Sequence, residues 1–301
     1  MELRHLRYFV AVAEELHFAH AAERLHIEQS PLSRAIKDLE LQLGVQLFAR
    51  TTRSTQLTWA GEVFLNETRR LLTTLELAIS TTRAAATGYR GSLRIALSDG
   101  VAQPWFAAIL AQSREAEPDV EIRLFEITLA EQVKGLRDNL YDAGFALASE
   151  PGEGITAQAV WTDSLVIAVP ARHPLLAYKR IPLAEFIRYP LVLCDPKRCE
   201  GYYRQIERIL RNINIEPIIA EYAITFDLMM TLVAAGYGLS FAKESHIAFC
   251  RYPEIVSRPL AGKPQVLTTY LLRSSAEPSE PLSRFIARAL AIETSSANVT
   301  A

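Results

Sequence analysis

Residues 29–61 read QSPLSRAIKDLELQLGVQLFARTTRSTQLTWAG, and the hydrophobic period changes once along this stretch. Up to Gly44 the apolar side chains recur every three or four residues, which predicts a helix with one buried stripe. Pro31 is tolerated in the first turn of such a helix, and Gly44 suits its C-terminal cap. The predicted buried stripe consists of Leu32, Ile36, Leu39 and Leu43.

The sequence after this helix predicts a β-hairpin. Apolar and polar residues alternate at the start of 45–58, the run 51–54 is a polar turn, and 56–58 reads as a short return strand. Upstream, helical periodicity covers 3–16, and a shorter helix follows over 18–25. Three helices followed by a hairpin predict a winged helix-turn-helix, whose last helix enters the major groove of DNA.

The predicted recognition helix has a polar face opposite its buried stripe. Glutamine can read adenine, arginine can read guanine, serine adapts to either, and a helix N-terminus attracts phosphate. The predicted wing adds two arginines without a neighbouring acid. The alternative is an amphipathic helical domain whose charges are merely solvated. The candidate DNA-binding residues are Gln29, Ser30, Pro31, Ser33, Arg34, Lys37, Arg50 and Arg53.

Bulk composition adds little to this hypothesis. The formal net charge of the 301 residues is −2, and acidic and basic residues balance within 1–58, so any DNA interface depends on where charges lie. We find no signal peptide and no apolar run that could span a membrane, and we expect a cytoplasmic protein with reduced thiols. The three cysteines are Cys194, Cys199 and Cys250.

Residues 59–87 contain no proline, and apolar residues recur there at steps of four and three. This heptad seam predicts a long helix that pairs with a second copy of the chain. The alternative is a long helix that folds back onto its own chain. The candidate dimerisation residues are Phe64, Leu71, Leu75 and Ala78.

From Leu93 onward strands and helices alternate, which predicts an α/β architecture with mostly parallel sheets. The length of this part suits two small lobes with a ligand cleft at the strand ends. The predicted strands are 93–97, 121–125, 143–148, 165–169, 191–193, 218–222 and 266–272. The predicted helices are 105–115, 130–139, 202–212, 226–235 and 281–292.

An enzyme is the main rival from another class of protein. The sequence carries no GxSxG, HExxH or P-loop pattern, so we expect no catalytic residues. His17, His20 and His26 cluster without a cysteine or carboxylate to complete a ligand set, and we interpret them as surface histidines rather than a metal sensor. We therefore expect neither a metal site nor a cofactor.

The N-terminal sequence resembles that of LysR-type transcriptional regulators over about 65 residues. The family pattern SRxIxxLExxLGxxLFxR followed by LTxAG is specific. It stands here as Ser33-Arg34-Ala35-Ile36, Leu39-Glu40, Leu43-Gly44, Leu47-Phe48-Ala49-Arg50 and Leu57-Thr58-Trp59-Ala60-Gly61.

The resemblance implies a DNA-binding regulator with three parts. They are a winged helix-turn-helix over 1–58, a linker and dimerisation helix over 59–89, and a regulatory domain over 90–301 that resembles a type 2 periplasmic binding protein. Its subdomain I would span about 90–161 and 267–301, and its subdomain II about 162–266. The chain differs from the usual family pattern at two positions of the turn, Glu28 and Ser30. Glu28 could cap the recognition helix.

The family resemblance further implies that a small-molecule inducer binds between the two subdomains. An arginine that binds carboxylates in some relatives is replaced by Leu147, and we predict an inducer that is not a dicarboxylate. Implied partners are double-stranded operator DNA and further copies in a homodimer and homotetramer, with RNA polymerase as an additional partner. The alternative function is an architectural DNA-binding protein without an effector. The candidate effector-binding residues are Ser98, Asp99, Thr128, Tyr202, Tyr203 and Phe226.

Overall fold

The computed structural model describes residues 1–50, 55–86, 91–100, 103–211 and 216–296. The chain divides into two compact units, Met1–Arg83 and Ala84–Ala301, and each is described by itself. Among the described residues, the helices lack an apolar stretch of the length that a membrane span requires.

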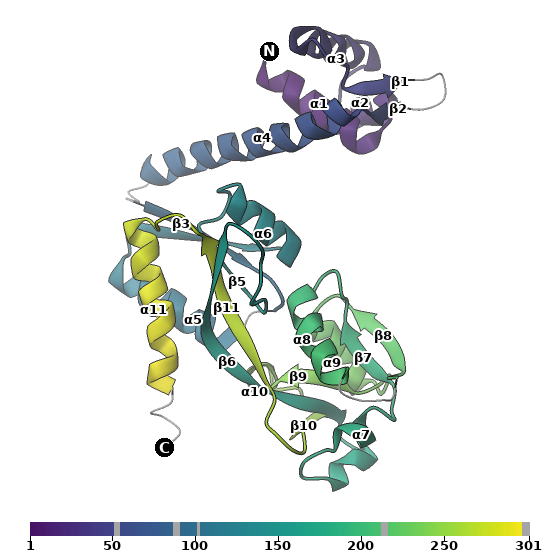
Figure 1. The fold of residues 1–301 in the computed structure, drawn as a ribbon, viewed down its shortest axis with the longest axis vertical. Coiled ribbons are helices and arrows are strands. Elements are labelled where there is room, and N and C mark those ends of the chain that lie inside the picture. The colour runs from purple at the N-terminus through teal and green to yellow at the C-terminus, as the bar shows by residue number, and fades with distance from the viewer. Residues whose placement is uncertain (51–54, 87–90, 101–102, 212–215, 297–301) are drawn as a thin grey trace. The chain divides into compact units, whose positions relative to one another are not determined.

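The first unit is a winged helix-turn-helix, as predicted (Figure 1). Its core joins the inner faces of the three short helices to the wing through aromatic contacts, including the rings of Phe9 and Phe48 at 5.5 Å. Its elements are α1 Leu3–Glu15, α2 Phe18–Arg24, α3 Gln29–Leu43, β1 Phe48–Arg50, β2 Thr55–Leu57 and α4 Trp59–Ala86.

The predicted stripe of the recognition helix α3 faces inward. Leu32, Ile36 and Leu39 are completely buried, and Leu43 is half-buried beside them. Gly44 ends the helix at a φ of 70°, the left-handed conformation that favours glycine. The backbone of Glu28 takes the N-cap position, but its side chain makes no capping hydrogen bond, so the predicted capping role is wrong in this respect.

The second unit is a mixed α/β structure built as two lobes. Its strands are β3 Gly91–Leu97, β4 Val120–Glu126, β5 Ala143–Ala146, β6 Ile155–Pro170, β7 Leu191–Cys194, β8 Ile219–Ala223, β9 Ser240–Lys243, β10 Ile255–Pro259 and β11 Val266–Ser274. Its α-helices are α5 Gln103–Ala116, α6 Leu129–Arg137, α7 Leu183–Phe186, α8 Glu200–Leu210, α9 Phe226–Ala234, α10 Glu244–Cys250 and α11 Glu280–Ser296, with a 3₁₀ helix over Pro174–Ala177.

The larger sheet orders its strands β10-β6-β11-β5-β3-β4, with β9 paired on β6. The pairs β3–β4, β3–β5 and β7–β8 are parallel, whereas every described pair that involves β6 or β11 is antiparallel. The expectation of mostly parallel sheets is therefore wrong. The cause is the pair of long strands β6 and β11, which continue from one half of this unit into the other.

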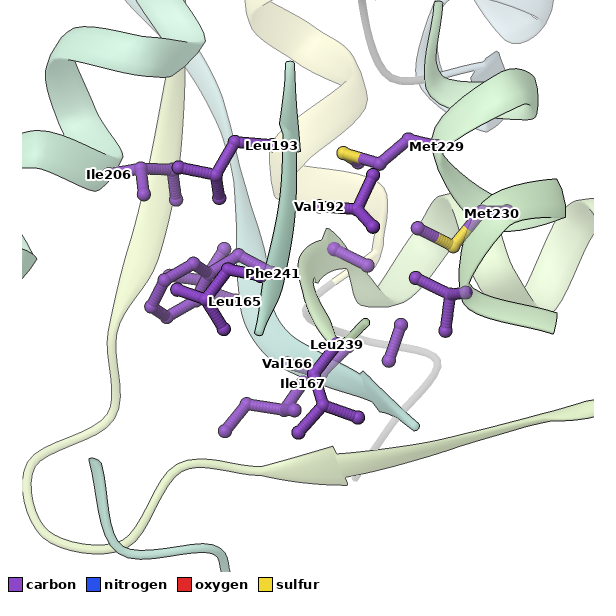
Figure 2. Packing of buried hydrophobic residues seen from close by; sticks show 14 of the residues in the cluster. Leu165, Val166, Ile167, Val192, Leu193, Ile206, Met229, Met230, Leu239 and Phe241 are labelled. Atoms are coloured by element: carbon purple, nitrogen blue, oxygen red, sulfur yellow. The ribbon is translucent and has the colours of Figure 1, made fainter. Parts of the chain in front are cut away.

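Two separate cores define two lobes within this unit. In lobe I, β3 and β5 pack against α5 and α11, which lie side by side (Figure 1). In lobe II, β7 places apolar side chains on both of its faces, because successive side chains of a strand point to opposite sides. One helix packs on each face. Figure 2 shows Leu193 directed toward Ile206 of α8, and Val192 on the opposite side toward Met229 and Met230 of α9.

Candidate functional site

The outer face of α3 is open to solvent where the sequence predicts DNA contacts. Gln29, Ser30, Pro31, Arg34 and Lys37 are exposed, and Ser33 is half-buried. These positions lie in the first half of a helix whose opposite face is fixed by the buried stripe. The geometry leaves the amide, hydroxyl and guanidinium groups free to meet an outside partner.

Glu40 ties the recognition helix to the wing. Its Oε1 atom accepts hydrogen bonds from the backbone N–H groups of Leu47 and Phe48, at 2.9 and 3.1 Å. Leu47 and Phe48 are 0% and 2% exposed, so these two N–H groups depend on a protein acceptor. The family motif thus places a carboxylate where the chain turns from helix to hairpin.

The LTxAG part of the motif fixes the other end of the hairpin. The Thr58 hydroxyl donates to the carbonyl of Gln46 at 2.7 Å and accepts from the Gly61 N–H at 3.0 Å. A Cβ atom at Gly61 would lie 2.1 Å from the Leu47 carbonyl oxygen, so only glycine allows α4 to approach this closely.

Of the two wing arginines, the structure describes only the backbone of Arg50. The backbone of Arg50 belongs to β1, which pairs with β2 in antiparallel register. The predicted contact residue Arg53 lies outside the described residues. Both assignments stay predictions.

The heptad seam of α4 has two parts, one packed on the helix-turn-helix core and one left partly or fully exposed. The first candidate, Phe64, packs on Phe9 of the same chain, with ring centroids 5.0 Å apart. Farther along, Leu71 is 49% exposed, Leu75 is half-buried and Ala78 is exposed. The part of the seam that remains available for a second chain therefore begins after the contact with Phe9.

A cleft of about 790 Å³ lies between the two lobes of the second unit, at the C-terminal ends of β3 and β4. Of the predicted effector residues, Ser98, Asp99, Thr128 and Phe226 line it. The Thr128 hydroxyl is engaged in a capping box with Glu131, which fixes the start of α6 at the cleft wall. Cleft residues thus come from strand ends and helix starts, as in other α/β ligand sites.

Tyr202 and Tyr203 do not line this cleft, which corrects the sequence-based assignment. Tyr202 is 1% exposed and lies in the core of lobe II, where its hydroxyl donates to the Phe241 carbonyl at 2.8 Å. Tyr203 is half-buried, with its ring near that of Tyr222. The helical stripe of α8 turns Tyr202 inward, so neither ring forms a flat wall for a ligand.

Asp99 is held in the cleft by several hydrogen bonds. It is 3% exposed, and burial raises the pKa of its carboxyl group, while backbone N–H donors and the charge of Lys243 oppose that rise. The Lys243 ammonium group donates to the backbone carbonyls of Asp99, at 3.0 Å, and of Gly100. It also lies 4.6 Å from the centre of the Phe226 ring. Burial lowers the pKa of Lys243 to about 8.

Sequence reasoning missed several cleft residues. Glu126, Arg198, Cys199, Asp227 and His246 also line the wall. Arg198 and Cys199 stand directly before α8, a position that the strand-then-helix pattern could have indicated. His246 belongs to α10, a short helix that the sequence did not predict.

One group of metal-ligating side chains lies beside the cleft within the described ranges. Ligand atoms of Asp227, His246 and Cys250 lie within 4.8 Å of one another. The Tyr252 hydroxyl already joins two of them, donating to Asp227 at 2.6 Å and lying 3.1 Å from the His246 ring nitrogen. The cluster is therefore satisfied by a tyrosine hydroxyl, and we assign no metal to it.

Comparisons with known proteins identify both units. Residues 3–62 match the family model for the bacterial regulatory helix-turn-helix protein of the lysR family, and residues 86–292 match the LysR substrate binding domain. The chain is 36% identical over 248 residues to the transcriptional regulator YnfL of Escherichia coli (strain K12), covering 81% of this chain and 83% of that protein. It is 33% identical over 245 residues to the regulator AlsR of Bacillus subtilis (strain 168), covering 81% of each.

The fold matches full-length members of the same group. The crystal structure of CbnR in complex with its target DNA superposes with a TM-score of 0.78 at 28% identity, covering 97% of this chain and all of that one. Full-length BenM superposes with a TM-score of 0.61 at 29% identity, covering 99% of this chain and 98% of that one. This protein is therefore a member of the LysR family of DNA-binding transcription regulators, with a helix-turn-helix domain and a substrate-binding domain for an effector.

Proposed function

We propose that this chain binds an operator through the exposed face of α3 and the wing, and that a small molecule in the cleft of the second unit controls its action on transcription. The proposed DNA contacts rest on the difference between the buried and the exposed face of α3. Its apolar stripe is buried, while Gln29, Ser33 and Arg34 face outward from the first turns. These are the side chains that recognise base edges, and Lys37 follows them as a phosphate contact.

The oligomer is proposed to form through α4. Leu71, Leu75 and Ala78 continue the heptad seam beyond the part that packs on the helix-turn-helix core. Two copies joined there would present two recognition helices to a partly palindromic site. A tetramer, RNA polymerase as a further partner and a cytoplasmic location belong to the same proposal.

The proposed effector mechanism is a shift between two assemblies. A ligand in the cleft changes the relation between lobes I and II only if it binds the two arrangements with different affinity. Such a change would alter how the paired DNA-binding units meet a bent operator. An architectural protein without an effector is the competing function, and a footprint that no metabolite changes would favour it.

The test of the DNA interface is Arg34→Ala in the full chain. Loss of a bidentate contact to guanine costs about 1–3 kcal/mol, so specific operator affinity should fall roughly 5- to 150-fold, while nonspecific affinity changes less. Arg114→Ala, which removes an exposed arginine of α5, is the matched control for net charge. A footprint of Arg34→Ala identical to wild type would show that the reading face is assigned wrongly.

A further inference from the structure

A carboxylate of the protein itself occupies the N-terminus of α8. Asp99 Oδ1 accepts hydrogen bonds from the backbone N–H groups of Gly201 at 2.9 Å and Tyr202 at 3.4 Å. Oδ2 accepts from the Leu147 N–H and the Ser98 hydroxyl, both at 3.2 Å. Free N–H groups in the first turn of a helix form an anion site, and here that site is filled from within the chain.

The backbone on both sides is shaped around this carboxylate. A Cβ atom at Gly201 would lie 2.4 Å from Asp99 Oδ2, so the close approach requires glycine. Asp99 and Gly100 have φ values of 57° and 55°, a left-handed turn that begins two residues after the end of β3. Aspartate is one of the few residues other than glycine that tolerates this conformation. The turn and the glycine together hold the carboxylate against α8.

The same residue links the two lobes of the second unit. Asp99 follows β3 of lobe I, whereas α8 belongs to lobe II. Lys243, on β9 of lobe II, donates to the backbone carbonyls of Asp99 and Gly100. Gln205 of α8 adds a bond to the Leu147 carbonyl at 2.7 Å. Charge-assisted hydrogen bonds of this kind are stronger than neutral ones, so the turn acts as a latch between the lobes.

We propose that Asp99 is a tethered anion. It fills the anion site at the start of α8 and latches the lobes, so the effector of the adjoining cleft carries no carboxylate there and instead presents hydrogen-bond donors without negative charge. This inference rests on the proposed function, because it describes the ligand of the proposed effector cleft.

The other charged groups of the cleft favour the same ligand class. Glu126 and Asp227 are exposed acids on its wall, and Arg198 is an exposed base. Burial lowers the pKa of His246, which disfavours the charged form of its ring. Asp99, Glu126 and Asp227 supply three carboxyl groups to the wall, against the cation of Arg198 on the wall and that of Lys243 behind Asp99. A ligand with a free carboxylate would meet repulsion and would find the N–H donors of α8 already used.

Chemical rescue tests the tethered anion directly. Asp99→Gly removes the carboxylate and suits the left-handed backbone, which leaves three N–H donors without their acceptor. We expect the melting temperature of the second unit to fall by roughly 5–10 °C in the full chain. Acetate should restore at least half of that loss in a saturable manner, whereas chloride at the same ionic strength should not.

Glu126→Ala is the matched control, because it removes an acid from the same cleft that makes no backbone hydrogen bond at α8. Neither it nor the wild-type chain should gain stability from acetate beyond the effect of chloride. Equal stabilisation of all three proteins by acetate would overturn the proposal, and so would an Asp99→Gly melting temperature equal to wild type. Saturable calorimetric binding of succinate or benzoate to the wild-type cleft would overturn the ligand class.

Asp99→Asn covers the case in which Asp99→Gly does not fold. Asparagine tolerates the same turn and keeps one acceptor oxygen but has no charge, so its melting temperature should lie below wild type and should not respond to acetate. A wild-type melting temperature for Asp99→Asn would show that the charge is dispensable. Operator binding is measured in parallel: failed rescue with intact operator binding refutes the tethered anion alone, and a wild-type chain that ignores operator DNA refutes the proposed function.

Discussion

Replacing Glu40 by alanine removes the carboxylate that joins the recognition helix to the wing. The backbone N–H groups of Leu47 and Phe48 then lose the acceptor that the structure provides at 2.9 and 3.1 Å. Both residues are almost fully buried, so water cannot replace the acceptor without opening the hairpin. The variant therefore separates the packing of α3 from the placement of the wing.

The magnitude follows from the two hydrogen bonds. A bond to a charged acceptor contributes about 1.5–3 kcal/mol, and Glu40 is itself half-buried, so we take the lower value for each and expect a loss of about 3 kcal/mol. Small domains are stable by only about 5–15 kcal/mol in total. The melting temperature of the first unit should fall by roughly 12–24 °C. Glu40→Gln keeps an acceptor oxygen without charge and should lose about half as much.

Hydrogen exchange and operator binding are the measurements. Amides within 45–50 and 55–58 should exchange much faster in Glu40→Ala, and operator affinity should fall even at temperatures where α3 remains folded. Asp38→Ala, an exposed acid on the same helix, is the matched control and should change neither quantity appreciably. The reasoning fails if Glu40→Ala keeps wild-type exchange rates in the hairpin, because the two N–H groups would then have another acceptor.

Two further changes test the oligomer and the buried lysine. Leu75→Asp should raise the dimer dissociation constant more than 100-fold in sedimentation velocity, since each chain loses about 1.5–3 kcal/mol of apolar burial. The control variant Thr74→Asp should leave the dissociation constant unchanged. A Leu75→Asp dimer as stable as the wild-type dimer would place the interface elsewhere. Burial lowers the pKa of Lys243 to about 8, whereas an unfolded lysine titrates near 10.4, so between these values the unfolded chain binds a proton that the folded chain does not. The free energy of unfolding should therefore rise with pH from 8 to 9.5, by at most about 1.4 kcal/mol per pH unit. Lys243→Met should reduce that slope in urea melts. An identical slope in both proteins would contradict the lowered pKa of Lys243.

Elements with strong local patterns could be predicted from the sequence. The stripe of Leu32, Ile36 and Leu39 recurs at helical spacing, and the structure buries all three. The heptads of 59–87 predicted one long helix, and α4 spans Trp59–Ala86. These features are determined by residues close together in the chain, which is why periodicity detects them.

Elements held by distant partners were missed. β9 has four residues and β10 ends in Pro259, so neither carries enough alternation to be recognised, and both exist because they pair with β6. The first half of β6 was missed because its polar residues face solvent while β11 supplies the hydrogen bonds. Tyr202 was assigned to the cleft because it stands at the start of a predicted helix, but the sequence did not give the direction of its side chain.

The same distinction explains why the sequence identifies the family more readily than the ligand. Glu40, Gly61 and the α3 stripe hold the helix-turn-helix together, and they stand within one short stretch of the sequence. The character of the cleft depends on Asp99 meeting Gly201, a contact between residues 102 positions apart that no local pattern reveals. A change at Asp99, the second residue after β3, can therefore replace one ligand class by another without disturbing the DNA-binding unit. In this chain the carboxylate of Asp99 already accepts hydrogen bonds from the N-terminus of α8. The effector therefore has to be recognised by the other groups of the cleft wall.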